Sequence, residues 1–325
     1  MLIIGTVAVG LTAYADAGGL EVPRVGIALE GTTAMPMLGM PGAAIFGPAL
    51  ELGFHPAVIR SAYAKNYALA IDAAQGRLML LRNIVSGSLI TAPIGSTGSD
   101  DLVLNAAEDS AVLISHAAST LQIVTGLPEN PEFSAAISFS SVGLPLTAVA
   151  LDGSGRNILA AFTDGSHGEI DWFDASGSRT FIFAGSQPSA IVYSNADQDA
   201  VVADRGSNQV FLIRNLTGSR EPVMLASAPD TIAPVALAVW NNTHVLIASQ
   251  DSKNLVDYDL RQMNVAARYD LPVAPSKLEP LIDPNFLMIN EVSPDPTYLF
   301  APAGHPFLYF MPPPQNRTRR LPVRR

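Results

Sequence analysis

A short unit of apolar runs separated by polar turns recurs along this chain and restricts its fold more than any other feature. In residues 201–215, VVADRGSNQVFLIRN, an apolar run ends at Asp204, crosses four polar or small residues and continues as an alternating run. Residues 246–260, LIASQDSKNLVDYDL, repeat the pattern. Asp and Asn side chains bond nearby backbone N–H groups, and Gly and Asn tolerate positive φ. We therefore predict a turn between the second and third strands of a repeated β-unit.

Six copies of this unit can be aligned, and successive copies start about 41–46 residues apart. The copies cover residues 57–84, 101–127, 146–175, 188–216, 234–260 and, with weaker similarity, 276–302. Such a spacing is typical of four-stranded β-propeller blades, as in WD40-type repeats. Looser fourth strands are expected at residues 88–94, 133–139, 179–184 and 265–269. Because no window shows a helical period, we predict an all-β fold.

The segment before the first copy sets the number of blades. Residues 24–53 suggest second, third and fourth strands without a first. Propellers often avoid a free edge by sharing one blade between strands from both chain ends. Six copies and this fragment predict a seven-bladed β-propeller of four-stranded blades. The alternative is six blades with an accessory N-terminal hairpin.

The chain divides into a single propeller domain over residues 22–314 with short segments on either side. Residues 1–17 have an apolar core and two A-x-A patterns, which end at Ala15 and Ala17, as in a cleaved signal peptide. No Lys or Arg precedes that core, which argues against a signal peptide, and the alternative is a first β-strand. The first interpretation predicts a periplasmic or secreted protein, and the second a cytoplasmic one. Residues 315–325 form a basic tail with five Arg, interpreted as a solvated end.

Composition excludes several classes of function. Hydrophobic residues make up 48% and charged residues 15% of the chain, as in a globular protein with a large core. The net charge of −10 argues against nucleic acid as a partner, which would require a basic stripe. The absence of cysteine excludes disulfides and thiolate metal sites. No stretch after the N-terminal segment has the length of a membrane span. We expect a monomer.

Two sequence stretches resemble a known group of repeats. The D-x-x-x-N-x-V pattern in residues 203–213, ADRGSNQVFLI, and its relative in residues 249–259, SQDSKNLVDYD, are similar to YVTN/NHL-type β-propellers of exported bacterial proteins. Residues 35–44, MPMLGMPGAA, also look like a segment of such propellers. The resemblance implies the propeller fold. It does not select a function, because propellers serve as enzymes, binding modules and scaffolds.

One set of side chains is a candidate site. Turn residues at equivalent places in successive units should lie on one face of a closed propeller and surround a mouth of its channel. Such a polar ring could hold a cation or a polar ligand, although turn Asp residues commonly cap their own turns. The residues in question are Asp72, Ser115, Asp164, Asp204 and Gln250.

No catalytic motif of a hydrolase, metalloprotease, P-loop or dinucleotide-binding enzyme is present. The five histidines show no metal-ligand spacing. We therefore predict a binding or scaffold module for a protein or a small polar ligand, without a cofactor. The alternative is a lactonase-like hydrolase with Ca²⁺ or another divalent cation in the channel, for which Asp164 and Asp204 are candidate ligands.

Overall fold

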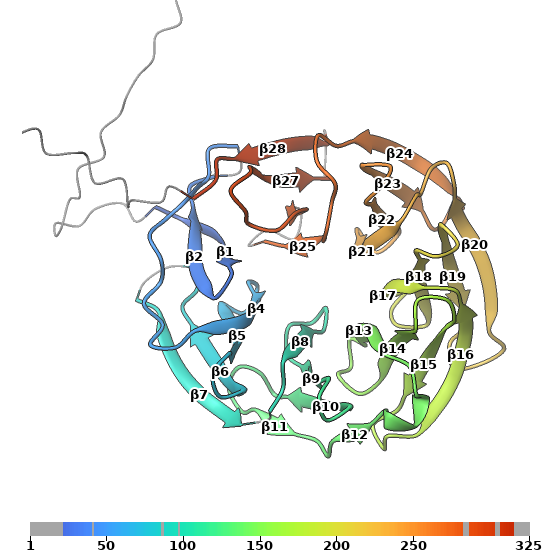
Figure 1. The fold of residues 1–325 in the computed structure, drawn as a ribbon, viewed down its shortest axis with the longest axis horizontal. Coiled ribbons are helices and arrows are strands. Elements are labelled where there is room, and N and C mark those ends of the chain that lie inside the picture. Colours follow the sequence, from blue (N-terminus) through green and yellow to red (C-terminus); the bar gives the residue numbers. More distant parts are fainter. Residues whose placement is uncertain are drawn as a thin grey trace, which may run out of the picture.

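The computed structural model describes residues 22–40, 42–85, 88–96, 98–281, 286–302 and 306–314. Over these residues the chain forms seven antiparallel sheets arranged in a ring, with one strand of each sheet nearest the central axis (Figure 1). The predicted all-β, seven-bladed β-propeller is therefore confirmed. The predicted signal peptide at residues 1–17 and the basic tail at residues 315–325 lie outside the described residues.

The blades follow one another in chain order. Blade 1 contains β1 (Arg24–Glu30), β2 (Thr33–Leu38) and β3 (Ile45–Phe46). Blade 2 contains β4 (Pro56–Ala62), β5 (Tyr67–Asp72), β6 (Arg77–Arg82) and β7 (Ile90–Ser96). Blade 3 contains β8 (Asp101–Leu104), β9 (Ala111–Ser115), β10 (Thr120–Thr125), β11 (Glu132–Phe133) and β12 (Ile137–Ser138), followed by the short 3-10 helix η1 (Ser140–Val142).

The remaining blades have four strands each. Blade 4 contains β13 (Leu146–Leu151), β14 (Ile158–Thr163), β15 (Gly168–Phe173) and β16 (Arg179–Gly185). Blade 5 contains β17 (Pro188–Ser194), β18 (Asp199–Asp204), β19 (Gln209–Arg214) and β20 (Glu221–Ser227). Blade 6 contains β21 (Pro234–Trp240), β22 (His244–Ser249), β23 (Asn254–Asp259) and β24 (Asn264–Asp270). Blade 7 contains β25 (Glu279–Pro280), β26 (Leu287–Met288), β27 (Thr297–Ala301) and β28 (Phe307–Met311).

The second strand of most blades is buried over its whole length. All six residues of β5 (YALAID) and of β14 (ILAAFT) are buried. A strand covered on both faces favours continuous apolar, small and β-branched residues over alternation. Burying each Leu or Ile side chain of this kind stabilises the fold by roughly 1.5–3 kcal/mol. The small-residue runs that suggested second strands therefore reflect contact with the neighbouring blade on either side.

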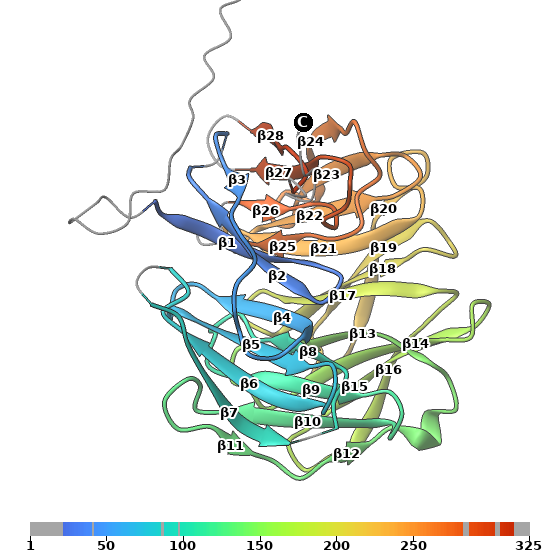
Figure 2. The same ribbon diagram turned by 60° about the vertical axis from the view of Figure 1, so that its left-hand side comes forward.

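Hydrophobic clusters join each blade to the next around the ring. The cluster between blades 7 and 1 contains Met37, Met288 and Met311, all nearly or fully buried. Figure 2 shows the strands of blade 1 between those of blade 7 and those of blade 2. Face-to-face packing of blades 7 and 1 therefore closes the ring.

The structure corrects two details of the prediction for blade 1. Residues 24–53 were expected to lack a first strand, but β1 lies on the inner side of the ring beside β4 (Figure 1). Among the described residues, blade 1 instead lacks a fourth, outermost strand. The ends of the chain were also expected to share a blade. Within the described residues, each sheet comes instead from one continuous stretch of chain. The apolar cluster between blades 7 and 1 explains how closure occurs without a shared sheet.

The turn predicted between residues 204 and 208 is confirmed. Asp204 ends β18, Gln209 begins β19, and the two residues pair across the sheet. Asn208 has a φ of 56°, a left-handed conformation that Asn tolerates better than most residues. The described part of the chain contains no helix with the length and apolarity needed to cross a membrane.

Candidate functional site: the central cavity

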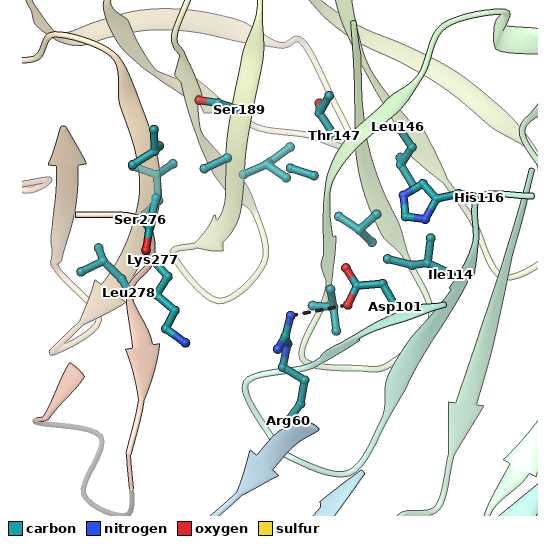
Figure 3. Close-up of a pocket in the computed structure, with 18 residues that line it drawn as sticks. Arg60, Asp101, Ile114, His116, Leu146, Thr147, Ser189, Ser276, Lys277 and Leu278 are labelled. Carbon is teal, nitrogen blue, oxygen red and sulfur yellow. Dashed lines mark hydrogen bonds and ion pairs between the residues drawn. The ribbon is translucent and has the colours of Figure 1, made fainter. Parts of the chain in front are cut away.

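The first strands of the blades surround a central cavity of about 340 Å³. Residues from β4, β8, β13, β17 and β21 line it, together with residues 276–278, which precede β25 (Figure 3). A pocket of this size is within the range that holds small-molecule ligands in other proteins. The cavity is thus the place where the ring brings side chains from six blades together.

One side of the cavity is charged. Arg60 of β4 and Asp101 of β8 both line it, and their side chains approach each other at 3.4 Å between Nη2 and Oδ1 (Figure 3). Their side chains are 39% and 37% exposed, so this pair is open to solvent. Charge-assisted N–H···O contacts are usually about 2.7–2.9 Å long. The Arg60–Asp101 pair is therefore a loose contact with room for another polar group.

Two further ionisable groups line the cavity with close partners. Lys277 Nζ lies 2.7 Å from a carboxylate oxygen of Glu279 and 3.0 Å from one of Glu291. His116 follows β9, and its Nδ1 lies 2.6 Å from Asp100 Oδ1. Figure 3 shows Lys277 and His116 on opposite sides of the cavity. Each of these two groups therefore has an acidic partner already in place.

The other side of the cavity is largely apolar. Leu146 and Val149 of β13, Ile191 of β17 and Leu237 of β21 contribute to its wall. Leu146, Ile191 and Leu237 are 5–9% exposed, since most of each side chain packs between blades. The polar residues on this side, Thr147 and Ser189, use their hydroxyl groups within the protein and do not change this character. All the ionisable residues of the lining therefore come from blades 2, 3 and 7, which also contribute Val103, Ile114 and Leu278, whereas blades 4, 5 and 6 contribute only apolar and small or hydroxyl side chains.

The hydroxyl groups of Thr147 and Ser189 connect neighbouring blades. Each lies at a β-bulge just after the start of a first strand. Thr147 donates to the carbonyl of Ala161 in its own blade and, at 2.9 Å, to that of Pro188 in blade 5. Ser189 bonds in the same way to the carbonyl of Pro234 in blade 6 at 2.6 Å. These bonds hold the inner strands of blades 4, 5 and 6 in register around the apolar wall.

Asp204, from the predicted polar ring, caps its own turn and also a link between blades. It is 2% exposed, and its Oδ1 accepts the backbone N–H groups of Gly206 and Ser207. The same carboxylate accepts the N–H groups of Ser186 and Gln187 at 2.7 and 2.8 Å. These two residues connect β16 to β17, so one side chain fixes the turn and the entry into the blade.

Asp72 and Ser115 occupy the equivalent position in blades 2 and 3. Asp72 Oδ1 accepts the backbone N–H of Ala74 at 3.0 Å. Ser115 Oγ donates to the carbonyl of Gly98 at 3.1 Å and accepts the N–H of Ala118. Both side chains are buried. Their described bonds therefore serve the local turns and the connections between blades.

The last two predicted ring residues lie beyond the ends of their strands. Asp204 pairs with the first residue of the first strand of its blade, and in blade 6 the residue with this pairing is Ser249. Gln250 therefore lies one position after the equivalent of Asp204. Asp164 follows the last residue of β14, and its Oδ1 accepts the N–H groups of Ser166 and His167. The bond from His167, followed by those from Ser166, lowers the pKa of Asp164 to about 2. Asp164 is therefore a capped, ionised turn residue.

The five predicted ring residues do not line the central cavity. The structure places three of them at matching turns and two beyond them, and it shows capping bonds for Asp72, Ser115, Asp164 and Asp204. A cation- or ligand-binding role for the ring remains a prediction.

A divalent metal does not fit the residues that the structure describes. Among them, no group of three or more His, Asp or Glu side chains lies close enough together to hold an ion. A catalytic metal in a protein usually needs at least three such ligands. The charged side of the cavity contributes Arg60, Lys277 and their acidic partners, which bond to one another.

Sequence reasoning missed the charged residues of the cavity. Arg60 interrupts an otherwise apolar or small run, AVIRSAYA (57–64), and Asp101 begins the run DLVL (101–104). First strands line the channel of a propeller, so a charged residue inside a first strand is the signal that could have identified them. The predicted ring consists of turn residues instead, and Asp is common in turns for local reasons.

No family model matches the chain, and no curated protein matches its sequence. Solved structures share its fold. A protein from Lactobacillus plantarum matches with a TM-score of 0.59 and 12% identity over 89% of this chain and 97% of that chain. Virginiamycin B lyase from Staphylococcus aureus matches with a TM-score of 0.57 and 11% identity over 78% and 83% of the two chains.

A putative 6-phosphogluconolactonase from Bacteroides fragilis matches with a TM-score of 0.58 and 12% identity, over 88% of this chain and 92% of that chain. Identities this low demonstrate a shared fold and no more. The similar structures include a lyase and a putative lactonase, so the fold by itself does not select a function.

Proposed function

We propose that this chain is an exported β-propeller of the YVTN/NHL type that acts as a binding module and holds a small ligand in its central cavity. The cavity carries this proposal, because it combines an apolar wall with an open pair of charged side chains. Apolar pockets with a few convergent polar groups are typical ligand sites. Protein partners, by contrast, usually recognise larger surfaces than this cavity offers.

A cavity-filling variant tests the proposal. Val235 lines the cavity at the β-bulge of β21, the position that Thr147 and Ser189 occupy in blades 4 and 5. Val235→Phe should place a ring in the cavity and abolish the thermal stabilisation that small-molecule ligands give the wild-type protein. A bound ligand at 100 times its Kd stabilises a protein by about 2.7 kcal/mol, which a melting curve detects.

Met224→Phe is the matched control, since Met224 lies on the outer strand β20 and is 52% exposed. This variant should retain every ligand response. A ligand whose effect survives Val235→Phe and disappears in Met224→Phe would place the binding site on the rim and contradict the proposal.

The alternative function, a hydrolase with a divalent metal in the channel, lacks a suitable set of metal ligands among the described residues. We therefore expect a chelator to leave the melting temperature of the purified protein unchanged. A drop in melting temperature that added Ca²⁺ reverses would favour the alternative, because it would reveal an ion that binds the native state.

Export is the second part of the proposal and rests on residues 1–17 alone. Mass spectrometry of protein recovered from outside the cytoplasm should find a new N-terminus after Ala15 or Ala17. An intact Met1 in exported material would show that this segment is not a cleaved signal.

A further inference from the structure

The ionisable side chains that line the central cavity differ in how closely they are paired. Lys277 has two carboxylate partners at 3.0 Å or less, and His116 has Asp100 at 2.6 Å. Arg60 and Asp101 meet only through one contact of 3.4 Å. Arg60 and Asp101 therefore lie side by side at the cavity, and their single contact leaves other donors of Arg60 and acceptors of Asp101 for a ligand.

Both members of this pair can form a hydrogen bond with a further partner. A guanidinium has five N–H donors. The described bonds of Arg60 are those from Nη2 to Asp101 and from Nη1 to the carbonyl of Ile59 at 3.2 Å. The described bonds of Asp101 use Oδ1, which also accepts the N–H of Leu102. A ligand carboxylate could thus pair with Arg60 while a ligand ammonium pairs with Asp101.

The apolar wall begins beside this pair, because blade 4 packs against blade 3, and continues around the cavity through blades 5 and 6. Leu146, Val149, Ile191 and Leu237 come from blades 4, 5 and 6, whereas Arg60 and Asp101 come from blades 2 and 3. Neighbouring hydroxyl groups bond within the protein and leave this wall without free donors of their own. A ligand that reaches both sides needs a charged end and an apolar body.

We propose that the cavity binds a small zwitterion with an apolar body, of the class of the apolar α-amino acids. This inference rests on the proposed binding function. A simple anion would pair with Arg60 but be repelled by Asp101. A simple cation would pair with Asp101 but be repelled by Arg60. A zwitterion compensates both charges at once and leaves no charged group unpaired on the partly desolvated surface.

Matched ligands provide the first test, by calorimetric titration of the full-length protein. L-leucine and L-phenylalanine should bind. N-acetyl-L-leucine lacks the ammonium group, L-leucinamide lacks the carboxylate and glycine lacks the apolar body, so each should bind at least about tenfold more weakly, the loss expected for one charged hydrogen bond or one apolar group. If N-acetyl-L-leucine or L-leucinamide binds as well as L-leucine, the proposal is overturned.

Variants of the charged pair provide the second test. Arg60→Met and Asp101→Asn remove one charge each and should weaken L-leucine binding by at least about tenfold. Arg268→Met is the matched control, because Arg268 forms an exposed ion pair with Asp230 at 2.6 Å from the outer strand β24. This control should bind L-leucine as the wild type does. Melting curves of all three variants verify that the propeller remains folded.

The outcomes distinguish this inference from the proposed function. If other ligands bind and Val235→Phe blocks them, but L-leucine and L-phenylalanine do not bind at millimolar concentration, the zwitterion proposal fails and the binding function stands. If L-leucine binds equally to wild type, Arg60→Met and Asp101→Asn, the charged pair is not its site. If Val235→Phe blocks no ligand at all, both proposals fail.

Discussion

Blades 4 and 6 each bury an aspartate where other blades bury a hydrocarbon side chain. The fourth residue of the third strand is Leu80, Ile123 and Leu212 in blades 2, 3 and 5, each at most 4% exposed. In blade 4 this residue is Asp171, with 0% exposure, and in blade 6 it is Asp257, with 5%. A buried carboxylate requires a partner, so the two blades must differ from the others around it.

The two blades satisfy the carboxylate in different ways. In blade 4, Arg179 of the fourth strand donates from Nε to Asp171 at 2.6 Å and also contacts Glu169. In blade 6, Trp240 of the first strand and His244 of the second approach Asp257 Oδ1 at 3.2 and 2.8 Å. One solution uses a permanently charged guanidinium, and the other uses the indole N–H of Trp240 and the imidazole Nδ1 of His244, which donates when it carries a proton.

The comparison shows that a blade can exchange an apolar residue for a charged one provided the partner comes from the same blade. Arg179, Trp240 and His244 all belong to the blade of the aspartate that they contact. Repeat architectures tolerate such local changes because each unit depends mainly on itself and its neighbours. The two aspartates should therefore respond differently to loss of their partners.

The largest effect should come from Arg179→Met. The substitution leaves the carboxylate of Asp171 in a fully buried site beside Glu169 without its cation. Removing one partner of a buried ion pair typically costs about 3–5 kcal/mol. We expect a loss of this size in the free energy of unfolding, measured by urea denaturation at neutral pH.

The double variant Asp171→Leu with Arg179→Met is the control for this prediction. It converts the site to the apolar form of blades 2, 3 and 5 and should recover most of the lost stability. If the double variant is as unstable as Arg179→Met alone, lost packing by the Arg179 stem explains the effect, and the ion pair does not.

His244→Ala should have a smaller effect in blade 6. Trp240 still donates to Asp257 after the substitution, so the carboxylate keeps one partner. Losing one hydrogen bond to a buried charged group costs about 1–3 kcal/mol. His167→Ala is the control, because the His167 side chain is 87% exposed and should be replaceable without loss. A cost equal to that of Arg179→Met would refute the distinction between the two blades.

Aspartates at the turns extend the comparison to carboxylates held by backbone N–H groups. Asp204 accepts four such groups, two of them from the connection between blades, whereas Asp72 accepts one. Asp204→Ala should therefore cost about 2 kcal/mol and Asp72→Ala about 1 kcal/mol in unfolding free energy.

The two turn effects should add in the double variant, because the residues belong to blades 2 and 5 and share no partner. A clear deviation from additivity would instead favour a common ion or ligand held by the predicted ring.

The fold was predictable because its signals are local and repeated. Each blade carries its own small-residue strand and its own turn, and the turn chemistry around Asp204 and Asn208 marks the boundary between two strands. Blade 1 was misassigned for the same reason. Its third strand β3 has two residues, and no turn in residues 24–53 indicates which strand lies nearest the axis.

The candidate site was not predictable by the same route. Arg60, Asp101 and Lys277 come from different blades, and they line one cavity because the closed ring brings those blades together around its axis. The buried Asp171 posed a similar difficulty, since its sequence context, GEIDWF, alternates as an ordinary third strand does. The local sequence pattern does not show which residues from different blades lie close together.

The smallest expected effect is a difference in pH dependence between Asp171 and Asp259. Burial, with a contribution from Glu169, raises the pKa of Asp171, although Arg179 opposes the shift. The backbone N–H of Gln262, followed by that of Arg261, lowers the pKa of Asp259 in blade 6. In an unfolded chain both carboxyls titrate near a pKa of about 3.9. The two groups should therefore contribute to stability with opposite pH dependence.

For Asp171 the native state binds its proton at a higher pH than the unfolded state does. Its contribution is fully present below the unfolded pKa and is lost as pH rises through the folded one. For Asp259 the contribution is present above the unfolded pKa and is lost as pH falls through the folded one. Urea denaturation from pH 7 to pH 3 should show the wild type gaining stability relative to Asp171→Asn and losing it relative to Asp259→Asn. Parallel curves for the wild type and Asp171→Asn would mean that Arg179 fully compensates the buried charge. Blades 4 and 6 would then differ in the partners of their buried aspartates but not in the pH dependence of stability.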